Sequence, residues 1–543
     1  MGVTQVDPSL FVAPAKSLAV SGGTAPFYVL QLRSPQHGQS DRHFIGKDLA
    51  HAEDEVEFYE KMLGIKDSAA WQISGFLFEY LGAVKLPCCD RDGKDLGEKN
   101  LLVMRNLRDG LEQIRLLDIK VGFLTADANW KGKSRFAAAR NQMVDSLTNS
   151  SVEGFRLEGF DGMPQSLQSC DPQMGAWFKR SEKQDKKARR FQFQKLSAKK
   201  ILAYFLDLRD TPEQHLATHC SRAEYQEAVL ERVIQKLGSL CKTLSLVPCP
   251  QKWIGSSVAL GFDTESMPPR NGLQAKVDQV IVNVFDWGRS ELLLPDKFLT
   301  LETEDKIDRT EFWEQYRKGV QRITYEALRC YYHRFTATSW DAVCFELWDF
   351  DAMTADDKIG QATIPLADTI TKEFPIMCPA GIKPLHAKGK DVKLSVAIEW
   401  RDYPTNPTFQ GGWEVRVVGV NVIPNMDKPA WNLLSKDKSD GYCTVTALQG
   451  PDQASWPKSP RSPLERSKVI QDDNHPQWNE AFEFAVRNKG DSQTGVMNAL
   501  LSSTGLANRE VSADELRCMF PSETVSPEEE EVAFNMFLHC AGM

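Results

Sequence analysis

The fold of this chain is decided by the stretch Leu116-Leu117-Asp118-Ile119-Lys120-Val121-Gly122. Its apolar residues predict a short strand, and alternation along a strand places Asp118 and Lys120 on one face and Leu117 and Ile119 on the other. An acid and an ammonium group facing one space suit phosphoryl transfer to a polyanion, because the acid orients an attacking hydroxyl while the lysine holds a phosphate. Taken alone, the pair is more typical of a salt bridge at a strand edge, so the flanking sequence has to decide.

The composition is that of a soluble globular protein, with 42% hydrophobic and 26% charged residues. The chain has 543 residues, and a usual domain size of about 100–250 residues predicts two or three domains. Its net charge of -9 argues against general nucleic-acid binding. We therefore expect no nucleic-acid partner.

Cysteine usage and the N-terminus predict a reduced, intracellular compartment. Twelve cysteines in 543 residues are too dilute for a disulfide scaffold, and none stands in a Cys-x-x-Cys spacing. The N-terminus lacks the basic start and apolar core of a signal peptide. Because no apolar run reaches the roughly 20 residues that span a bilayer, we expect a cytoplasmic location with membrane contact only at the periphery.

The first third of the chain has the pattern of a small sheet with a covering helix. Residues 27–33 and 42–47 alternate as paired strands, and residues 54–63 read as a helix with Val56, Tyr59 and Leu63 on one face. A buried strand at 101–104 then runs into a turn-rich connection at 105–110. This order is the opening of a kinase-like N-terminal lobe and hinge, although any small sheet with a helix would share it.

Another acidic residue follows the apolar strand predicted at 279–285. The tripeptide Asp286-Trp287-Gly288 ends this strand. A strand that ends in Asp-aromatic-Gly suits a metal ion held against nucleotide phosphates. The alternative is an ordinary glycine turn, and the helix predicted at 311–332 then closes the unit.

Six short motifs occur in one order and together resemble the inositol polyphosphate kinase family over about residues 27–335. They are Ile45-Gly46-Lys47 with Glu55-Val56-Glu57-Phe58-Tyr59-Glu60, Leu107-Arg108-Asp109-Gly110, Asp118-Ile119-Lys120-Val121-Gly122, Gly154-Phe155-Arg156-Leu157-Glu158-Gly159, Ile254-Gly255-Ser256-Ser257-Val258, and Phe285-Asp286-Trp287-Gly288. The resemblance implies a two-lobed α+β kinase-like domain that uses ATP and Mg²⁺ to phosphorylate an inositol phosphate.

The resemblance also implies roles for individual residues of the cleft. Lys47 looks like the lysine that binds ATP phosphates, with Glu55 as its helix partner. Asp118 and Lys120 match the catalytic acid and the substrate-phosphate lysine. Asp286 matches the aspartate that holds Mg²⁺ on the nucleotide.

The hinge is expected to bind the nucleoside. By the same resemblance the backbone of Met104 to Asn106 faces adenine, and Asp109 binds the ribose. The chain departs from the family pattern at Ile114, where proline is usual, and at the Arg105-Asn106 pair, where an acid is common.

A substrate with several phosphates needs several cations, because each charge-assisted contact offsets only part of the desolvation cost. Lys179 and Arg180 open a basic stretch at 179–190 that lies near the family's substrate site, although a solvated charge run is an equal alternative. Lys131, Lys133 and Arg135 are further substrate-binding candidates. They lie in a polar segment at 125–140 that resembles an insertion shaping substrate access.

The second half of the chain resembles a C2 domain with calcium loops. Asp349, Asp351 and Asp357 match ligands of the third loop by spacing, while Asp427 and Asp440 match the first loop. Calcium prefers clustered hard oxygens, and carboxylates gathered without a cation repel one another.

The C2 motifs occur in a rearranged order, since the third-loop pattern precedes the first. Either one sandwich has a permuted strand order or two units have each lost half their strands. Half a sandwich exposes sheet edges and an apolar face, so we favour a single all-β sandwich. Bound calcium would attract an anionic membrane surface, and the alternative is a C2-like sandwich that binds no calcium.

The expected organisation is a kinase-like domain at 1–338, a C2-like domain at 339–490 and a helical or disordered tail at 491–543. Our leading hypothesis is an ATP- and Mg²⁺-dependent inositol phosphate kinase with a C2 domain for calcium-dependent membrane association. The second is a non-enzymatic scaffold that binds calcium, phospholipid and an inositol phosphate. A protein kinase is disfavoured because the Gly-rich loop and His-Arg-Asp signature are missing.

Overall fold

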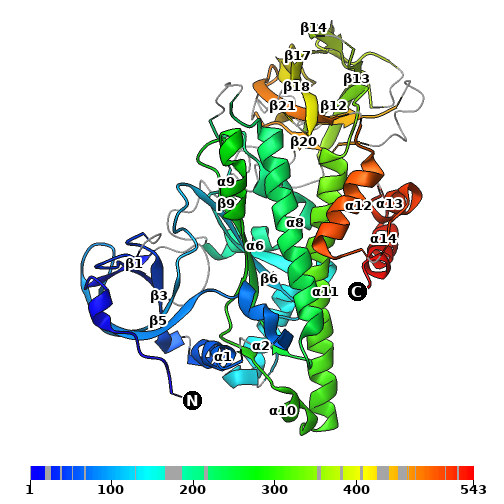
Figure 1. Cartoon of the computed structure of the whole chain (residues 1–543). Helices are drawn as coiled ribbons and strands as arrows, with labels where there is room; N and C mark the ends of the chain where they lie inside the picture. Colours follow the sequence, from blue (N-terminus) through cyan, green and yellow to red (C-terminus); the bar gives the residue numbers. More distant parts are fainter. Residues whose placement is uncertain are drawn as a thin grey trace.

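The protein is elongated, with a small lobe, a helical lobe and a group of strands that follow one another along the chain (Figure 1). This computed structural model describes residues 2–18, 26–36, 40–51, 53–65, 69–128, 130–164, 186–212, 218–350, 356–367, 369–379, 383–403, 406, 408–424, 439–450, 461–462, 464–470, 473–488, 490–507, 509–521 and 525–543. None of the helices in these ranges combines the length and the apolar character needed to cross a membrane.

The N-terminal lobe is a closed barrel with the strand order β1-β2-β3-β5-β4. Its strands are β1 (Ala15–Leu18), β2 (Phe27–Leu30), β3 (Phe44–Asp48), β4 (Tyr80–Cys89) and β5 (Asp95–Arg105). The predicted pairing of the first two motif strands is confirmed, since Phe27 lies opposite Lys47 across β2 and β3. Apolar residues such as Phe44 and Val103 fill the barrel.

Helix α1 (Glu53–Leu63) lies beside the barrel and joins its outer face to the second lobe. Val56 and Tyr59 are buried as predicted, whereas Leu63 is 37% exposed because the helix ends there. Phe58 and Met62 complete the buried face instead. The helix thereby fixes the position of the acid that it carries, Glu55, which is 1% exposed.

The second lobe is built on an antiparallel sheet with the order β10-β9-β6-β7. Its strands are β6 (Ile114–Val121), β7 (Phe155–Asp161), β9 (Ser257–Asp263) and β10 (Ile281–Phe285). Two long helices, α8 (Arg222–Leu246) and α11 (Thr303–Phe335), pack along this lobe. The predicted helix at 311–332 is thus part of a longer one, which begins with Glu304 and Asp305 in its first turn, where acids favour the helix dipole.

The remaining elements of the two lobes are short. They are η1 (Pro8–Leu10), η2 (Leu49–His51), η3 (Ala69–Phe76), η4 (Trp130–Gly132), α2 (Arg135–Ser146), α3 (Ser150–Glu153), α6 (Lys186–Gln194), α7 (Ala198–Leu206), β8 (Lys252–Trp253), η5 (Arg270–Gly272), α9 (Leu273–Asp278), β11 (Ser290–Glu291) and α10 (Pro295–Leu299).

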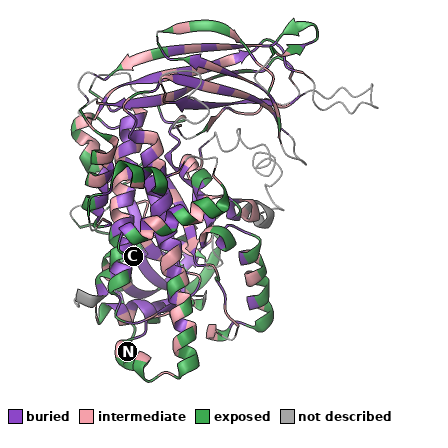
Figure 2. Cartoon of the chain, turned by 90° about the vertical axis from the view of Figure 1, so that its right-hand side faces the viewer, coloured by how far each residue is buried: buried purple, intermediate pink, exposed green. Residues whose placement is uncertain are grey.

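Two four-stranded sheets follow, with the orders β13-β12-β19-β20 and β14-β17-β18-β21. The strands are β12 (Ala342–Asp349), β13 (Asp357–Pro365), β14 (Ile370–Pro375), β17 (Lys393–Asp402), β18 (Phe409–Val420), β19 (Gly441–Leu448), β20 (Glu465–Arg466) and β21 (Gln477–Arg487), with the small pair β15 (His386–Ala387) and β16 (Lys390–Asp391). Both sheets contribute to one apolar core, and Figure 2 shows them as two layers with buried residues inside.

Strands from the two halves of the C2-like pattern are neighbours in this arrangement. Strand β12 pairs with β19 along its whole length, from Ala342 opposite Leu448 to Asp349 opposite Gly441. The early and late motifs therefore share a sheet. This pairing agrees with a single rearranged unit, as the exposed-edge argument predicts.

The tail returns to the helical lobe instead of extending from the strands. It forms α12 (Gln493–Thr504), α13 (Ala513–Met519) and α14 (Pro527–Cys540), and α14 begins with the capping box of Ser526 and Glu529. Apolar residues of all three helices join the core of α8 and α11. Ion pairs from Glu530 to Arg329 at 2.9 Å and from Glu531 to Lys318 at 2.9 Å border the contact.

Candidate active site

Strand β6 places Asp118 and Lys120 side by side, as the alternation predicts. Leu117 and Ile119 are 0% and 1% exposed, whereas Asp118 and Lys120 are only partly buried. Both charged residues therefore lie on the face of the sheet away from the core of the lobe. The ammonium of Lys120 donates a hydrogen bond to the carbonyl oxygen of Gly255 at 2.9 Å, which ties it to the Ile254-Gly255-Ser256-Ser257-Val258 motif.

Asp286 reaches Lys120 because β10, β9 and β6 are consecutive strands of one sheet. Its Oδ2 lies 3.5 Å from the Nζ of Lys120. Asp286 has a φ of 65°, a left-handed backbone that is uncommon for residues other than glycine. Such a conformation costs about 1–3 kcal/mol and persists only where the surroundings impose it, which is typical of functional positions.

Lys47 brings the barrel into the same cluster. Its Nζ lies 2.5 Å from Oε2 of Glu55 and 3.2 Å from Oδ1 of Asp286. Burial disfavours the ammonium, but Glu55 and Asp286 outweigh this effect and raise the pKa of Lys47. One carboxylate, Asp286, thus contacts lysines of both lobes.

The pKa values of the two aspartates of the cluster are shifted in opposite directions. Burial raises the pKa of Asp118 to about 6, although Lys120 opposes the shift. Partial burial also disfavours ionisation of Asp286, but the ammonium groups of Lys47 and Lys120 lower its pKa to about 2. Asp118 is therefore suited to accept a proton near neutral pH, while Asp286 stays ionised.

The Gly154 motif supports this face from the neighbouring strand β7. Arg156 lies opposite Lys120 and donates a 2.8 Å hydrogen bond from Nε to Glu158. It also pairs with the buried Asp145. Burial alone would raise the pKa of Glu158, but Lys120, Arg156 and Arg190 outweigh it and hold the pKa at about 2.

Glu158 is a charged neighbour of Lys120 to which the sequence analysis assigned no role. Glu158 belongs to the Gly154-Phe155-Arg156-Leu157-Glu158-Gly159 motif. Its position two residues after Arg156 on a predicted strand indicated that the two side chains share a face. This pattern could not predict that Glu158 lies near Lys120, because the pairing of β7 with β6 is not readable from sequence. Glu158 acts on the cluster by keeping a negative charge near Lys120.

The predicted hinge residues are engaged with the barrel. The backbone N–H of Asn106 donates to the carbonyl of His43 at 2.7 Å, and its side chain donates to the carbonyl of Arg42 at 2.9 Å. Asp109 pairs with the imidazole of His43 through Oδ2. Met104 pairs with Ile45 and Tyr80 inside the barrel sheet. The roles of Met104, Asn106 and Asp109 in nucleoside binding stay predictions.

The predicted substrate lysines differ in position. Lys131 lies 3.0 Å from Asp54 at the start of α1, so its charge is already paired. Lys133 is 7% exposed, and its Nζ has no hydrogen-bond partner among the described residues. Burial, then Arg289 and Lys120, lower the pKa of Lys133 to about 8. Lys179 and Arg180 lie outside the described residues.

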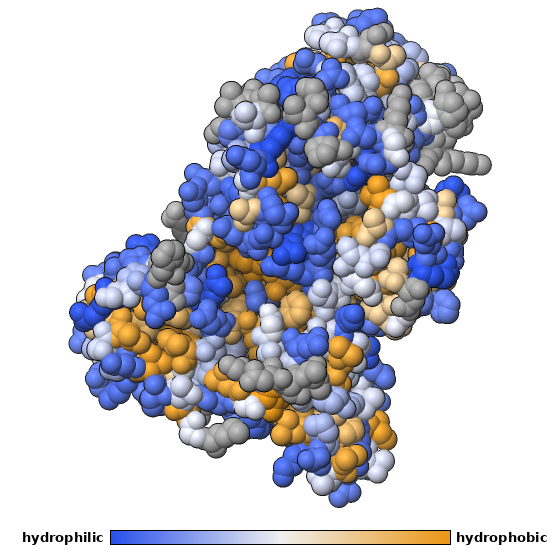
Figure 3. Space-filling view, in the orientation of Figure 1, coloured by the Kyte–Doolittle hydropathy of each residue, from blue (hydrophilic) through white to orange (hydrophobic). Residues whose placement is uncertain are grey.

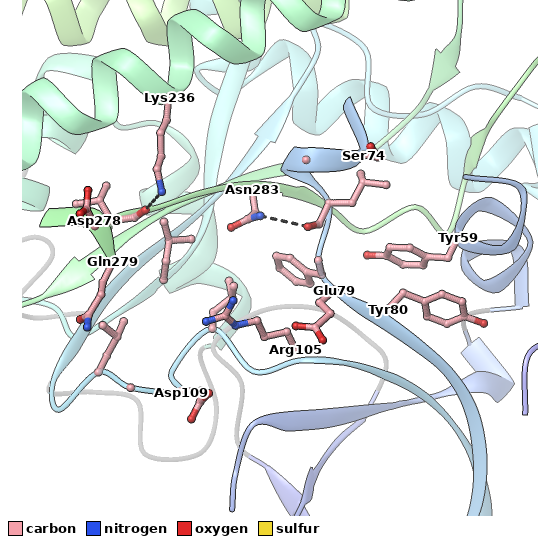
Figure 4. A pocket seen from close by; sticks show the side chains of 18 of the residues that line it. Tyr59, Ser74, Glu79, Tyr80, Arg105, Asp109, Lys236, Asp278, Gln279 and Asn283 are labelled. Atoms are coloured by element: carbon pink, nitrogen blue, oxygen red, sulfur yellow. Dashed lines mark hydrogen bonds between the residues drawn. The ribbon is translucent and has the colours of Figure 1, made fainter. Parts of the chain in front are cut away.

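A cavity of about 930 Å³ lies between the two lobes. It is bordered by α1, the hinge and the start of β10, and its lining residues include Tyr59, Arg105, Asp109, Lys236 and Asn283 (Figure 4). On this face of the molecule apolar residues gather in the hollow between the lobes (Figure 3). Of the predicted cleft residues, only Asp109 lines this cavity.

The predicted calcium ligands lie partly outside the described residues. Asp349 is opposite Asp357 across β12 and β13, and its Oδ1 accepts a 2.7 Å hydrogen bond from the backbone N–H of Asp440. These three residues therefore meet at one sheet end. Within the described ranges no group of three or more His, Cys, Asp or Glu residues is arranged to hold a metal ion. Asp351 and Asp427 lie outside those ranges.

Comparisons with known proteins agree with this organisation. The model of the inositol polyphosphate kinase family matches residues 101–338, and the C2 domain model matches residues 331–376 and 411–501. The kinase match includes Asp118, Lys120 and Asp286 but begins after Lys47 and Glu55. No curated protein matches the chain.

A similar solved structure is that of inositol phosphate multikinase Ipk2 from S. cerevisiae in complex with ADP and Mn²⁺. It is 17% identical, with 53% of this chain and 98% of that chain covered and a TM-score of 0.35. The family models agree with the motifs quoted from the sequence. The chain therefore carries an inositol polyphosphate kinase domain followed by a C2 domain.

Proposed function

We propose that the protein is an ATP-dependent kinase that transfers a phosphoryl group to an inositol phosphate. The observation that carries this proposal is the convergence of Lys47 on β3, Lys120 on β6 and Asp286 just after β10, with distances of 3.2 and 3.5 Å to the shared carboxylate. Phosphoryl transfer depends mainly on positioning and on charge stabilisation. A cluster with two ammonium groups, one ionised carboxylate and one proton acceptor meets both needs.

The residues present fit a divalent cation with ATP. Asp286 offers a carboxylate in a conformation that its surroundings impose, and Asp118 has a buried Oδ1 without a hydrogen-bond partner among the described residues. Hard carboxylate oxygens suit Mg²⁺, so Asp286 would hold it. When bound, the ion neutralises charge on the nucleotide phosphates.

Side chains of this protein perform the proton transfer and hold the two reactants. Asp118, with a pKa raised to about 6, accepts the proton of the attacking hydroxyl, since it is largely ionised at neutral pH and still basic enough to take a proton. Lys120 orients the substrate by a phosphate contact. Lys47 holds a nucleotide phosphate, and its pairing with Glu55 fixes the direction of the ammonium.

A phosphorylated substrate is supported by the cations that gather on this side of the sheet. Lys133 faces Lys120 and Arg289 closely enough that each lowers its pKa. Like charges gathered in a largely buried space are unfavourable unless an anion joins them. An inositol phosphate carries several such anionic groups, and each supplies charge-assisted hydrogen bonds.

The test is to incubate the purified full chain with ATP, Mg²⁺ and a panel of inositol phosphates that differ in the number of phosphate groups. We expect one or more to gain a phosphate, and Asp286→Asn to abolish the transfer. Asp514→Asn is the matched control, because Asp514 is an exposed carboxylate of α13 that pairs with Arg517, outside both the cluster and the cavity. Absence of phosphorylation with the whole panel contradicts the kinase and favours the scaffold.

For the C2 domain we propose calcium-dependent, peripheral association with anionic membranes of the cytoplasm. The family match and the meeting of Asp349, Asp357 and Asp440 at one sheet end support the proposal. The test is sedimentation with phosphatidylserine vesicles, with and without calcium. Equal binding in both conditions rejects a calcium switch and leaves a C2 domain that only positions the kinase.

A further inference from the structure

Helix α2 of the kinase domain exposes an apolar stripe. Phe136 is 82% exposed, Met143 62% and Leu147 52%. The spacings of seven and four residues place these side chains on one helix face. Val152, in the adjoining α3, is 74% exposed. Large apolar side chains gathered on one exposed face mark an interaction surface.

The exposed charged side chains of α2 itself are both positive. Arg135 and Arg140 are exposed, and Arg140 occupies the same face as Phe136 because it follows four residues later. Neither arginine forms an ion pair in the part of the chain that the structure describes. The acid of α2, Asp145, is 1% exposed and is paired with Arg156. The solvent face of α2 therefore presents apolar and positive groups together.

Hydrogen bonds near both ends of α2 attach it to the kinase domain. The hydroxyl of Ser134 caps its N-terminus by accepting a hydrogen bond from the backbone N–H of Ala137. The buried carboxylate of Asp145 accepts hydrogen bonds from the backbone N–H of Thr125 at 2.8 Å and from its hydroxyl at 2.7 Å. These contacts fix which face turns outward.

We propose that the face formed by Phe136, Arg140, Met143 and Leu147 is a docking surface for an anionic lipid bilayer. Apolar side chains enter the boundary between headgroups and acyl chains, while flanking arginines contact anionic headgroups. The charge pattern favours this occupant over a protein, whose surface would need acids placed opposite each arginine and a shaped apolar socket. A bilayer accepts the same stripe without such a fit.

This contact is separate from the C2 domain and needs no calcium. The segment that precedes α2 also contacts the loop that follows Asp286. The indole N–H of Trp130, five residues before α2, donates to the carbonyl of Arg289 at 2.8 Å, three residues after Asp286. A bilayer on α2 would therefore hold the kinase domain itself at the membrane, whether or not that domain proves to be active.

The experiment is sedimentation of the full chain with vesicles in the presence of a calcium chelator. One set of vesicles is phosphatidylcholine alone, and the other contains phosphatidylserine. We expect binding to the second set and a loss of about tenfold or more in the partition coefficient for Phe136→Ser/Met143→Ser. For Arg135→Glu/Arg140→Glu we expect about tenfold or more weaker binding to the phosphatidylserine vesicles.

Val532→Ser is the matched control, because Val532 is 68% exposed on α14 and should leave binding unchanged. Phe136→Trp should bind at least as well as the unmodified chain, since tryptophan prefers the membrane interface, and this variant tests the proposal even if the serine variants fold poorly. Unchanged binding of folded Phe136→Ser/Met143→Ser overturns the proposal. It is also overturned if the unmodified chain does not bind phosphatidylserine vesicles without calcium.

Discussion

The cleft between the lobes and the acidic end of the C2 sheets both gather carboxylates, but they balance them differently. In the cleft, Asp286 lies within 3.5 Å of two ammonium groups. At the C2 end, Asp349 accepts a backbone N–H of Asp440, and Asp357 lies opposite on the next strand. The first arrangement pairs one carboxylate with two lysines, whereas at the second Arg466 lies 3.7 Å from Asp356, beside the three aspartates for which calcium is proposed.

The two sites therefore differ in what offsets the repulsion between their carboxylates. Lysines in the cleft hold the carboxylates in place before any ligand arrives, so ligand binding replaces existing ion pairs. Carboxylates that gather around a cation repel one another until it binds. Substitution of a paired residue in the cleft should accordingly impair both chemistry and folding, whereas substitution of the exposed Asp357 in the C2 domain should impair only the cation response.

The largest expected effect is that of Asp118→Asn on turnover. An amide cannot accept the proton of the attacking hydroxyl, and loss of a general base costs about 10²–10⁴ in rate. Turnover is measured with saturating ATP and inositol phosphate. Asp161→Asn is a suitable control, because Asp161 is the last residue of β7 and pairs with Arg108 outside the cluster. Loss of less than about tenfold would show that Asp118 is not the base.

Lys47→Met should cost stability as well as activity. It leaves Glu55, which is 1% exposed, without its 2.5 Å partner, and breaking a buried pair costs about 3–5 kcal/mol. Thermal or denaturant unfolding measures this loss. The double variant Lys47→Met/Glu55→Gln should recover most of the stability but none of the turnover. If the two substitutions destabilise additively, the pair is not the cause.

Asp357→Asn tests the proposed calcium site of the C2 domain. If calcium binds at this sheet end, losing one carboxylate weakens calcium-dependent vesicle binding by about tenfold and leaves turnover on a soluble substrate unchanged. Asp391→Asn is the control, since Asp391 pairs with His386 in a separate hairpin. If both substitutions weaken calcium-dependent vesicle binding equally, general surface charge and not a calcium site explains the binding.

The smallest expected effect is a change in the pH dependence of substrate affinity. The pKa of Lys133 is lowered to about 8, so its positive charge is present below that pH and is lost as the pH rises through it. The KM for the inositol phosphate should therefore rise by about three- to tenfold between pH 7 and pH 9.

Lys133→Met should show the higher KM at both pH values. The fall in turnover below about pH 6, where Asp118 with its raised pKa becomes protonated, should persist in this variant. A KM in Lys133→Met that still rises across this range would mean that another group carries the titration.

Sequence alone was sufficient for the shared face of Asp118 and Lys120, whereas the roles of Lys47 and Asp286 in the same cleft followed from the family resemblance. Alternation in β6 determines that Asp118 and Lys120 share a face, and Asp286 ends an apolar strand that pairs in the same sheet. The strand order of the folded sheet, which the sequence does not give, brings them together. The same logic predicted that the early and late C2 motifs would share one unit, because separate halves would leave sheet edges exposed.

The sequence could not predict the contacts of side chains whose partners lie in loops. The engagement of Asn106 and Asp109 with Arg42 and His43 depends on the conformation of two loops. The pairing of Lys131 with Asp54 likewise joins segments that no periodicity relates. The packing of the tail was also unreadable, because its apolar faces find their partners on helices about 200 residues earlier.

That packing has a consequence for biosynthesis. Met497, Phe534 and Phe537 complete an apolar core whose other members come from α8 and α11. A ribosome has to finish the C2 strands before these residues emerge, so the helical lobe stays incomplete during most of translation. The kinase lobe and the C2 domain therefore mature in an interleaved order, and shortened products that end before α12 would expose the apolar surface that the tail covers.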